Sequence, residues 1–142
     1  METSREMLEM CACTRLRTAA RLVTRAYDDV MRPAGIKASQ LAVLAAIDAA
    51  DETSIAGLSK VLHMDRTTLS RNLKPLLAEK FITLSEDGYG RSKTARITKS
   101  GENTLRKAFP LWRKAQDALL NQAGKEHLND LHFRLRRLIR TY

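Results

Sequence analysis

The sequence predicts a mainly α-helical domain that carries one small two-stranded β-hairpin. Through most of the 142 residues, apolar side chains recur every three or four positions, which is the spacing of an amphipathic helix. The pattern changes only between residues 81 and 97, where two short runs flank a glycine-containing loop. The composition is 44% hydrophobic and 29% charged, which suits a folded core. We therefore expect one continuous domain over residues 1–142.

The N-terminal part predicts two helices. Residues 13–31 place their apolar side chains on one face and several arginines on the other, and Pro33 and Gly35 end this helix. Ser39 is expected to cap a second helix, which runs over residues 40–50. That helix is nearly all apolar, so it should lie at the centre of the domain.

Two further helices follow, separated by a tight turn. Ser54 is expected to cap a short helix over residues 55–62, and Asp65 a longer helix that begins directly after it. Residues 63–64 form the turn between them. Pro75 removes one backbone hydrogen bond from the longer helix, which predicts either a kink or a separate last turn.

The last third of the chain predicts the hairpin and two more helices. Residues 81–84 and 93–97 are expected to be strands joined by a flexible loop. Thr98 starts a long helix that Pro110 should bend, and Gly124 separates it from a final helix. These terminal helices have apolar faces but few aromatic residues to build a core of their own. A second copy of the chain is therefore an expected partner.

The order of these elements is that of a winged helix-turn-helix. In the helix after Asp65, a rotation of 100° per residue places four leucines on one side, namely Leu69, Leu73, Leu76 and Leu77. The opposite side carries hydroxyl groups and positive charges, with no carboxylate before Glu79. An ordinary solvated helix face would more often mix glutamate with lysine.

This polar face suits the major groove of double-stranded DNA. The Arg71 guanidinium can pair with a guanine edge, Lys74 can contact a phosphate, and threonine can offer a hydroxyl or a methyl group. In the hairpin, Arg91 and Lys93 are placed to reach a minor groove or the phosphate backbone. The expected DNA-binding residues are Ser39, Arg66, Thr67, Thr68, Ser70, Arg71, Lys74, Arg91 and Lys93.

The charge distribution also indicates a polyanionic partner. The chain has 25 basic and 16 acidic residues, for a formal net charge of +9. Residues 1–59 carry a net charge of −1, whereas residues 60–101 and 102–142 each carry +5. A basic half predicts nucleic acid as the partner, with solubility alone as the alternative. A protein that binds nucleic acid without sequence preference also remains open.

Other classes of protein find little support in the sequence. The longest apolar run is seven residues, from Leu41 to Ile47, against the roughly 20 of a membrane helix. The charged N-terminus does not resemble a signal peptide, so we expect a soluble cytoplasmic protein without a membrane partner. No phosphate loop, nucleophile elbow or zinc motif is present, so we expect neither enzymatic activity nor a cofactor. The three histidines do not have metal-ligand spacing, so we expect no metal site.

The stretch from Ser54 to Leu76 resembles the helix-turn-helix of MarR-type transcriptional regulators. The stretch from Arg91 to Gly101 resembles their second wing strand and the threonine-to-glycine opening of the next helix. The resemblance implies a homodimer whose N- and C-terminal helices interlock, with one winged helix per subunit on successive major grooves. It also implies a repressor that leaves a pseudo-palindromic operator when a small molecule or an oxidant acts.

The resemblance also divides the chain into parts and exposes three departures. Residues 1–35 and 99–142 are expected to be dimerisation helices, and residues 36–98 the winged helix-turn-helix. The wing of the family usually carries Asp-Arg-Arg, where this chain has Tyr89-Gly90-Arg91, so the carboxylate that braces the wing arginine is missing. His63 stands where a glycine is usual between the two helices, so it must tolerate the turn geometry, and Lys80 replaces a glycine that is usual before the first wing strand.

Two kinds of signal are open for such a regulator. One is a small aromatic or phenolic acid bound between the dimerisation helices and the DNA-binding lobe, for which the sequence names no pocket residues. The other is oxidation, because Cys11 and Cys13 begin the first helix, where the peroxide-sensing branch of the family carries its reactive thiol. Arg15 and Arg17 can lower the pKa of such a thiol, and buried or idle thiols are the alternative. On one helix, residues two apart point to opposite sides, so these cysteines should not bond to each other.

Overall fold

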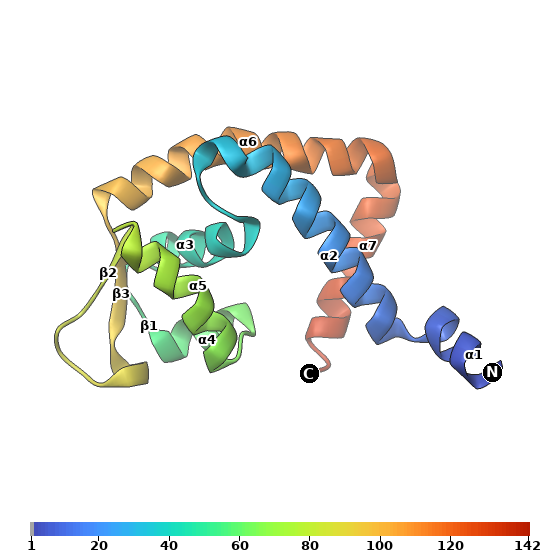
Figure 1. Ribbon diagram of the computed structural model, residues 1–142, viewed down its shortest axis with the longest axis horizontal. Coiled ribbons are helices and arrows are strands. Elements are labelled where there is room, and N and C mark those ends of the chain that lie inside the picture. The colour runs from blue at the N-terminus through green and yellow to red at the C-terminus, as the bar shows by residue number, and fades with distance from the viewer. Residues whose placement is uncertain (1) are drawn as a thin grey trace.

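The computed structural model describes residues 2–142, with the side chains of Glu2 and Arg91 outside the described part. The elements in chain order are α1 (Glu2–Met10), α2 (Ala12–Met31), the 3₁₀ turn η1 (Arg32–Ala34), α3 (Ala38–Ala50), β1 (Thr53–Ser54), α4 (Ile55–Leu62), α5 (Arg66–Ala78), β2 (Ile82–Leu84), the 3₁₀ turn η2 (Gly90–Ser92), β3 (Thr94–Ile97), α6 (Lys99–Ala123) and α7 (Lys125–Ile139). Figure 1 shows α3, α4, α5 and the strands in one lobe, with α6 reaching from this lobe to α7. The predicted fold class, mainly α-helical with a small β-wing, is confirmed.

The first predicted helix is α2, and a short helix that was not predicted precedes it. Cys11 has extended backbone angles and separates α1 from α2. Gly35 takes φ +69° after η1, a conformation that favours glycine, and this ends the N-terminal helical segment as expected. Figure 1 shows α1 projecting from the end of α2, away from the lobe.

The start of α3 corrects one prediction. Ser39 is not the N-cap, because α3 already begins at Ala38 and Lys37 holds the cap position. The Asp28 carboxylate of α2 accepts the Ala38 N–H at 2.7 Å, and the Gln40 side chain accepts the Lys37 N–H at 3.1 Å. The cap comes from a residue ten positions earlier in the chain, which a local sequence signal does not reveal.

The helix-turn-helix follows the sequence closely. The Ser54 hydroxyl accepts the Gly57 N–H at 3.0 Å, and the Asp65 carboxylate accepts the Thr68 N–H at 2.8 Å, so both predicted caps are confirmed. His63 takes φ +49° in the turn between α4 and α5. The helix α5 continues through Pro75 to Ala78, so its last turn is not a separate segment.

The wing contains one strand more than predicted. The sheet is antiparallel with the order β1-β3-β2, and β1 comes from the segment between α3 and α4. In its register, Thr53 faces Ala95 and Ser54 faces Thr94. A strand of two residues has no sequence period, so only its pairing with β3 identifies it.

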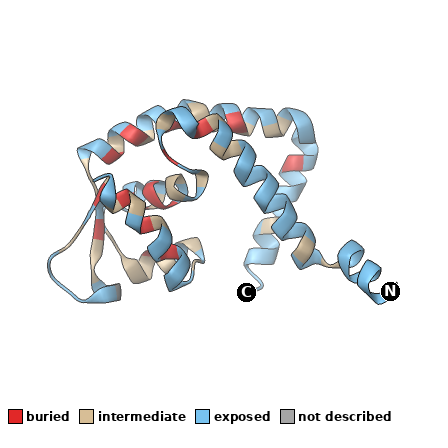
Figure 2. Ribbon diagram, in the orientation of Figure 1, coloured by how far each residue is buried: buried red, intermediate tan, exposed pale blue. Residues whose placement is uncertain are grey.

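The hydrophobic core lies between α3, α5, the sheet and the first half of α6. Figure 2 shows the buried residues concentrated there, whereas the outer faces of α2 and α7 are exposed. The fully buried large side chains are Met31, Val43, Leu44, Ile47, Leu58, Leu69, Leu76 and Ile82. This confirms the expectation that the apolar helix α3 is central.

The start of α6 is packed against the segment that leads into β2. The Thr98 hydroxyl donates to the Lys80 carbonyl at 2.7 Å and accepts the Gly101 N–H at 3.1 Å. A Cβ atom at Gly101 would lie 2.2 Å from the Phe81 carbonyl oxygen, so only glycine fits there. Lys80, which stands where the family usually has glycine, takes φ +57°. In the described range, no helix combines the length and the apolar character needed to cross a membrane.

Candidate nucleic-acid interface

The helix α5 presents a buried face of leucines and an exposed polar face. Leu69, Leu73 and Leu76 are buried, and Leu77 is half-buried. The predicted contact residues on the other face are all exposed, namely Arg66, Thr67, Thr68, Ser70, Arg71 and Lys74. Within the part of the chain that the structure describes, Arg66, Arg71 and Lys74 form no ion pair with an acidic side chain. The arrangement therefore presents hydroxyl groups and cations that are available to an anionic partner.

The first turn of α5 is fixed by its cap. The Asp65 carboxylate accepts the Thr68 N–H at 2.8 Å and the Thr68 hydroxyl at 3.1 Å. These hydrogen bonds hold the pKa of Asp65 below its ordinary value. Because its hydroxyl is already engaged, Thr68 is less available to a partner than Thr67.

The wing lies close to the polar face of α5. A groove of about 390 Å³ separates them, with Arg66, Ser70 and Lys74 on one side and Gly90 of the wing on the other. Lys93 is half-buried at the base of the wing, where its carbonyl accepts the Ile55 N–H at 3.0 Å. The structure thus brings the α5 residues and the wing together. Arg91 lies in η2, but its side chain is outside the described part, so its predicted contact is not tested.

Ser39 lies at a different place from the other predicted contact residues. It is exposed in the first turn of α3. Its neighbours Lys37 and Gln40 line a groove with Pro75 and Glu79, which belong to the C-terminal end of α5. Ser39 is therefore near the opposite end of α5 from Arg66.

The two cysteines are not equivalent. Cys11 is half-buried at the junction of α1 and α2, whereas Cys13 is exposed in α2. The Thr14 hydroxyl and the backbone amides at the start of α2 hold the pKa of the Cys11 thiol below its ordinary value. Sequence reasoning named Arg15 and Arg17 as residues that can lower this pKa, but the Arg15 side chain donates to the Glu9 carbonyl at 2.6 Å. The prediction that both cysteines lie on one helix is wrong for Cys11.

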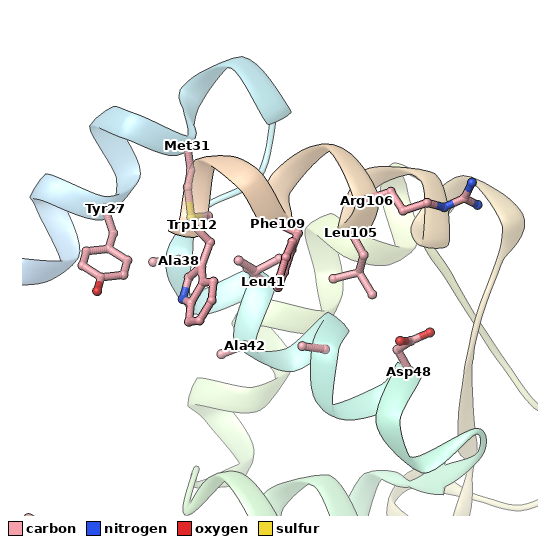
Figure 3. Close-up of a pocket in the computed structure, with 11 residues that line it drawn as sticks. Tyr27, Met31, Ala38, Leu41, Ala42, Asp48, Leu105, Arg106, Phe109 and Trp112 are labelled. Carbon is pink, nitrogen blue, oxygen red and sulfur yellow. The ribbon is translucent and has the colours of Figure 1, made fainter. Parts of the chain in front are cut away.

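A separate cavity of about 730 Å³ lies between α2, α3 and α6 (Figure 3). Aromatic side chains of Tyr27, Phe109 and Trp112 line it, and Phe109 and Trp112 stack with ring centroids 5.8 Å apart. In Figure 3, Tyr27 is at one end, and Asp48 and Arg106 are at the other. The Tyr27 hydroxyl donates to the Gln116 side chain at 2.5 Å, and burial raises the pKa of Tyr27. These residues come from distant segments, so no local signal joins them.

Two residues of the wing region were also missed by sequence reasoning. Tyr89 exposes 94% of its surface next to Gly90, and the Ser92 hydroxyl accepts its backbone N–H at 2.9 Å. An exposed aromatic residue in a wing loop is a signal that the sequence already contained. Arg96 forms an ion pair with Glu52, which lies 44 positions away and was not predictable from spacing.

Comparisons with known proteins agree with this geometry. Residues 34–92 match the sequence model of the MarR family. No curated protein sequence matches the chain significantly. The transcriptional regulator MosR of M. tuberculosis is 28% identical, with a TM-score of 0.78 and with 95% of this chain and 99% of that chain covered. The structure of MosR in complex with DNA gives 29% identity and a TM-score of 0.73, over 90% of this chain and 98% of that chain.

A more distant structure shows the same fold. The transcriptional repressor CouR bound to p-coumaroyl-CoA has a TM-score of 0.82 and is 19% identical, with 96% of each chain covered. The matched family region contains α3, α4, α5 and β2, which build the lobe that carries the exposed cations. The chain therefore has the winged helix-turn-helix fold of these regulators, and its residues 34–92 match the MarR family.

Proposed function

We propose that this chain is a sequence-specific DNA-binding repressor that acts as a homodimer. The observation that carries the proposal is the exposed face of α5, where hydroxyl groups and unpaired cations lie above a row of buried leucines within the described residues. A helix of this kind suits the major groove. The structure of MosR in complex with DNA, at 29% identity, supports this proposal. We assign the chain no enzymatic activity.

Each group on the interface takes a defined role in this proposal. Arg71 reads a base edge, because its exposed guanidinium can donate two parallel hydrogen bonds to guanine. Arg66 and Lys74 contact phosphates, Thr67 and Ser70 offer hydroxyl groups, and the wing residues Arg91 and Lys93 contact the neighbouring backbone. Ser39 contacts a phosphate near the other end of α5.

A binding experiment with two DNA sequences tests the proposal. The wild-type protein should bind its own promoter fragment more tightly than a scrambled duplex of the same length. Arg71→Ala should relax selectivity at one base position by about 1–3 kcal/mol, whereas Lys74→Gln should weaken binding to all sequences together. Equal affinity of the wild type for both duplexes would instead identify a non-specific nucleic-acid-binding protein.

The homodimer is proposed from apolar surface that has no partner within one protomer. The helix α1 has nine residues, and isolated helices shorter than roughly 12–15 residues are marginal in water. It exposes Met7, Leu8 and Met10 by 68–75%, and the described part of α7 exposes Leu138 and Ile139. A second copy of the chain that covers these faces would stabilise both. Residues 1–35 and 99–142 thus form the dimerisation region, and residues 36–98 the DNA-binding region.

Sedimentation measurements test the dimer. The wild type should sediment as a dimer, and Leu138→Glu should shift it toward the monomer because a charge would then be buried in the interface. Asn129→Glu, at an exposed polar position of α7, is the matched control and should remain dimeric. In the dimer, the two copies of α5 should lie about 34 Å apart, which is one turn of DNA. A monomeric wild type at working concentration would contradict the proposal.

We also propose that a small aromatic acid in the cavity between α2, α3 and α6 releases the repressor from DNA. The cavity volume of about 730 Å³ is within the range of roughly 300–1,000 Å³ that small-molecule sites occupy. Its aromatic walls suit a planar ring, the Arg106 guanidinium offers hydrogen-bond donors, and the Tyr27 hydroxyl oxygen can accept a hydrogen bond from the ligand. Because α3 belongs to the DNA-binding lobe and α2 and α6 to the dimerisation region, a ligand there can change their relative position.

A variant that fills the cavity tests this proposal. Ala42 lines the cavity, so Ala42→Phe should occupy the space of the ligand and leave the DNA-binding face unchanged. 4-Hydroxybenzoate and related phenolic acids should release DNA from the wild type and not from the variant. Ala49→Phe, at an exposed position of the same helix that is not among the cavity residues, is the control. Equal release from the wild type and from Ala42→Phe would exclude this cavity as the effector site.

Thiol oxidation is the second candidate signal. It is favoured by Cys11, which lies at the break between two helices and has a lowered pKa. Hydrogen peroxide should weaken DNA binding by the wild type and by Cys13→Ser, but not by Cys11→Ser. If peroxide leaves the wild type and a variant without both cysteines equally able to bind DNA, the thiols have no sensing role.

A further inference from the structure

An ion pair joins the wing to the segment that precedes the helix-turn-helix. The Arg96 guanidinium on β3 donates through Nε, at 2.9 Å, and through Nη2 to the Oε2 atom of Glu52. The other side-chain ion pairs of the described residues join positions three or four apart on one helix or turn. The Glu52–Arg96 pair is thus the one long-range ion pair of the described structure.

The backbone places Glu52 where the wing attaches to the DNA-binding helices. Asp51 takes φ +61° after α3 and turns the chain toward β3. Directly after Glu52, β1 pairs with β3 over two residues and continues into α4. The Ile55 N–H, the first of α4, donates to the Lys93 carbonyl at 3.0 Å. The Glu52–Arg96 pair adds a side-chain contact to these backbone contacts at the same junction.

The ion pair lies outside the hydrophobic core. Ala95 on β3 is fully buried, whereas the side chains of Arg96 and Glu52 are 66% and 40% exposed. The wing has two other acidic residues, Glu86 and Asp87, both exposed and without a recorded ion pair among the described residues. Among the described residues, Glu52 is therefore the carboxylate that forms an ion pair with the wing, and it comes from outside the wing.

We propose that the Glu52–Arg96 pair is a brace that sets the position of the wing relative to α5 and thereby tunes the affinity for DNA. The inference rests on the proposed DNA-binding function. Glu52 and Arg96 are positioning residues in this proposal and do not contact DNA. Because the pair is partly exposed, its loss should weaken DNA binding by about two- to fivefold, equally for all sequences.

The main test compares two variants that remove one negative charge each. Loss of any carboxylate near a polyanion should strengthen binding slightly through long-range electrostatics. Glu86→Gln should show this strengthening, whereas Glu52→Gln should weaken binding because it loosens the wing. If Glu52→Gln strengthens binding as much as Glu86→Gln does, the ion pair with Glu52 keeps Arg96 from contacting a phosphate. The brace proposal is then overturned.

A charge exchange distinguishes the brace from a general loss of stability. Arg96→Glu should weaken DNA binding, and the double variant Glu52→Arg with Arg96→Glu should restore it to within about twofold, since the pair re-forms with the net charge unchanged. The melting temperature of each variant is measured in parallel. The affinity for DNA should change while the melting temperature stays close to that of the wild type. A double variant that binds no better than Arg96→Glu would overturn the proposal.

Hydrogen exchange in the free protein provides a readout that does not depend on DNA. In Glu52→Gln, the Ile55 N–H should exchange faster than in Glu86→Gln, because the junction of β1, β3 and α4 opens more often. Unchanged exchange at Ile55 would refute the brace. If the wild type binds no DNA, the proposed function fails, while this exchange experiment still decides whether the brace exists.

Discussion

The salt dependence of DNA binding gives a quantitative test of the interface, and Lys74→Gln is the perturbation. Lys74 is exposed on α5 beside the groove that faces the wing, and no recorded ion pair holds its ammonium group among the described residues. We assign it to a phosphate. Each neutralised phosphate releases condensed counterions, so the slope of log K against log salt counts these contacts.

The magnitude follows from the number of cations at the interface. With Arg71 assigned to a base, Arg66, Lys74, Arg91 and Lys93 remain for phosphates, and a dimer doubles this set. The expected slope is then about −7, and Lys74→Gln should reduce its magnitude by about 1.8. Between 50 and 200 mM salt, the wild type should lose roughly 10⁴-fold in affinity and the variant roughly 10³-fold.

Fluorescence anisotropy with a labelled operator duplex at several salt concentrations measures both slopes. Lys125→Gln removes the same charge from the start of α7, outside the proposed interface, and serves as the matched control. Its slope should equal that of the wild type. A Lys74→Gln slope that is indistinguishable from the Lys125→Gln slope would refute the assignment of Lys74 to a phosphate.

Three further predictions concern the supports of the interface. Gly101→Ala should destabilise the fold by about 2–4 kcal/mol in urea unfolding, because its Cβ would overlap the Phe81 carbonyl, whereas Ser100→Ala should change little. His63→Gly should stabilise the fold by about 1 kcal/mol, because φ +49° is unfavourable for histidine; an unchanged melting temperature would contradict this. The lowered pKa of Asp65 stabilises the fold above the ordinary aspartate pKa, and this contribution is lost as the pH falls through the lowered value. The free energy of unfolding of Asp65→Asn should therefore fall less steeply at acid pH than that of the wild type. The same pH dependence in both proteins would count against this role for Asp65.

Elements with strong local signals were predictable from the sequence. The caps at Ser54 and Asp65 depend on residues within three positions, so the sequence identified both. The orientation of α5 was also predictable, because the positions of Leu69 and Leu73 on a helical turn decide which face is buried. His63 in the turn could be located because the turn between two capped helices is short.

Other features depend on residues that meet only in the folded chain. The cap of α3 comes from Asp28 on another helix, which is why the local signal at Ser39 was misleading. The strand β1 is too short to have a period of its own, and it exists because β3 offers hydrogen-bonding partners. Glu52 and Arg96 are 44 positions apart and meet only in the folded chain, so their contact could not be inferred from spacing along the sequence.

The amino-acid sequence by itself determined the helices from α2 onward, the caps at Ser54 and Asp65 and the chemistry of the face that α5 presents, because these depend on neighbours within one or two turns of the chain. The tertiary structure alone decided the third strand, the aromatic cavity around Trp112 and the link between Glu52 and Arg96. The physical reason is that local hydrogen bonding and hydrophobic periodicity act over a few residues. Packing and long-range ion pairs, in contrast, join segments whose distance in space is set only when the core closes.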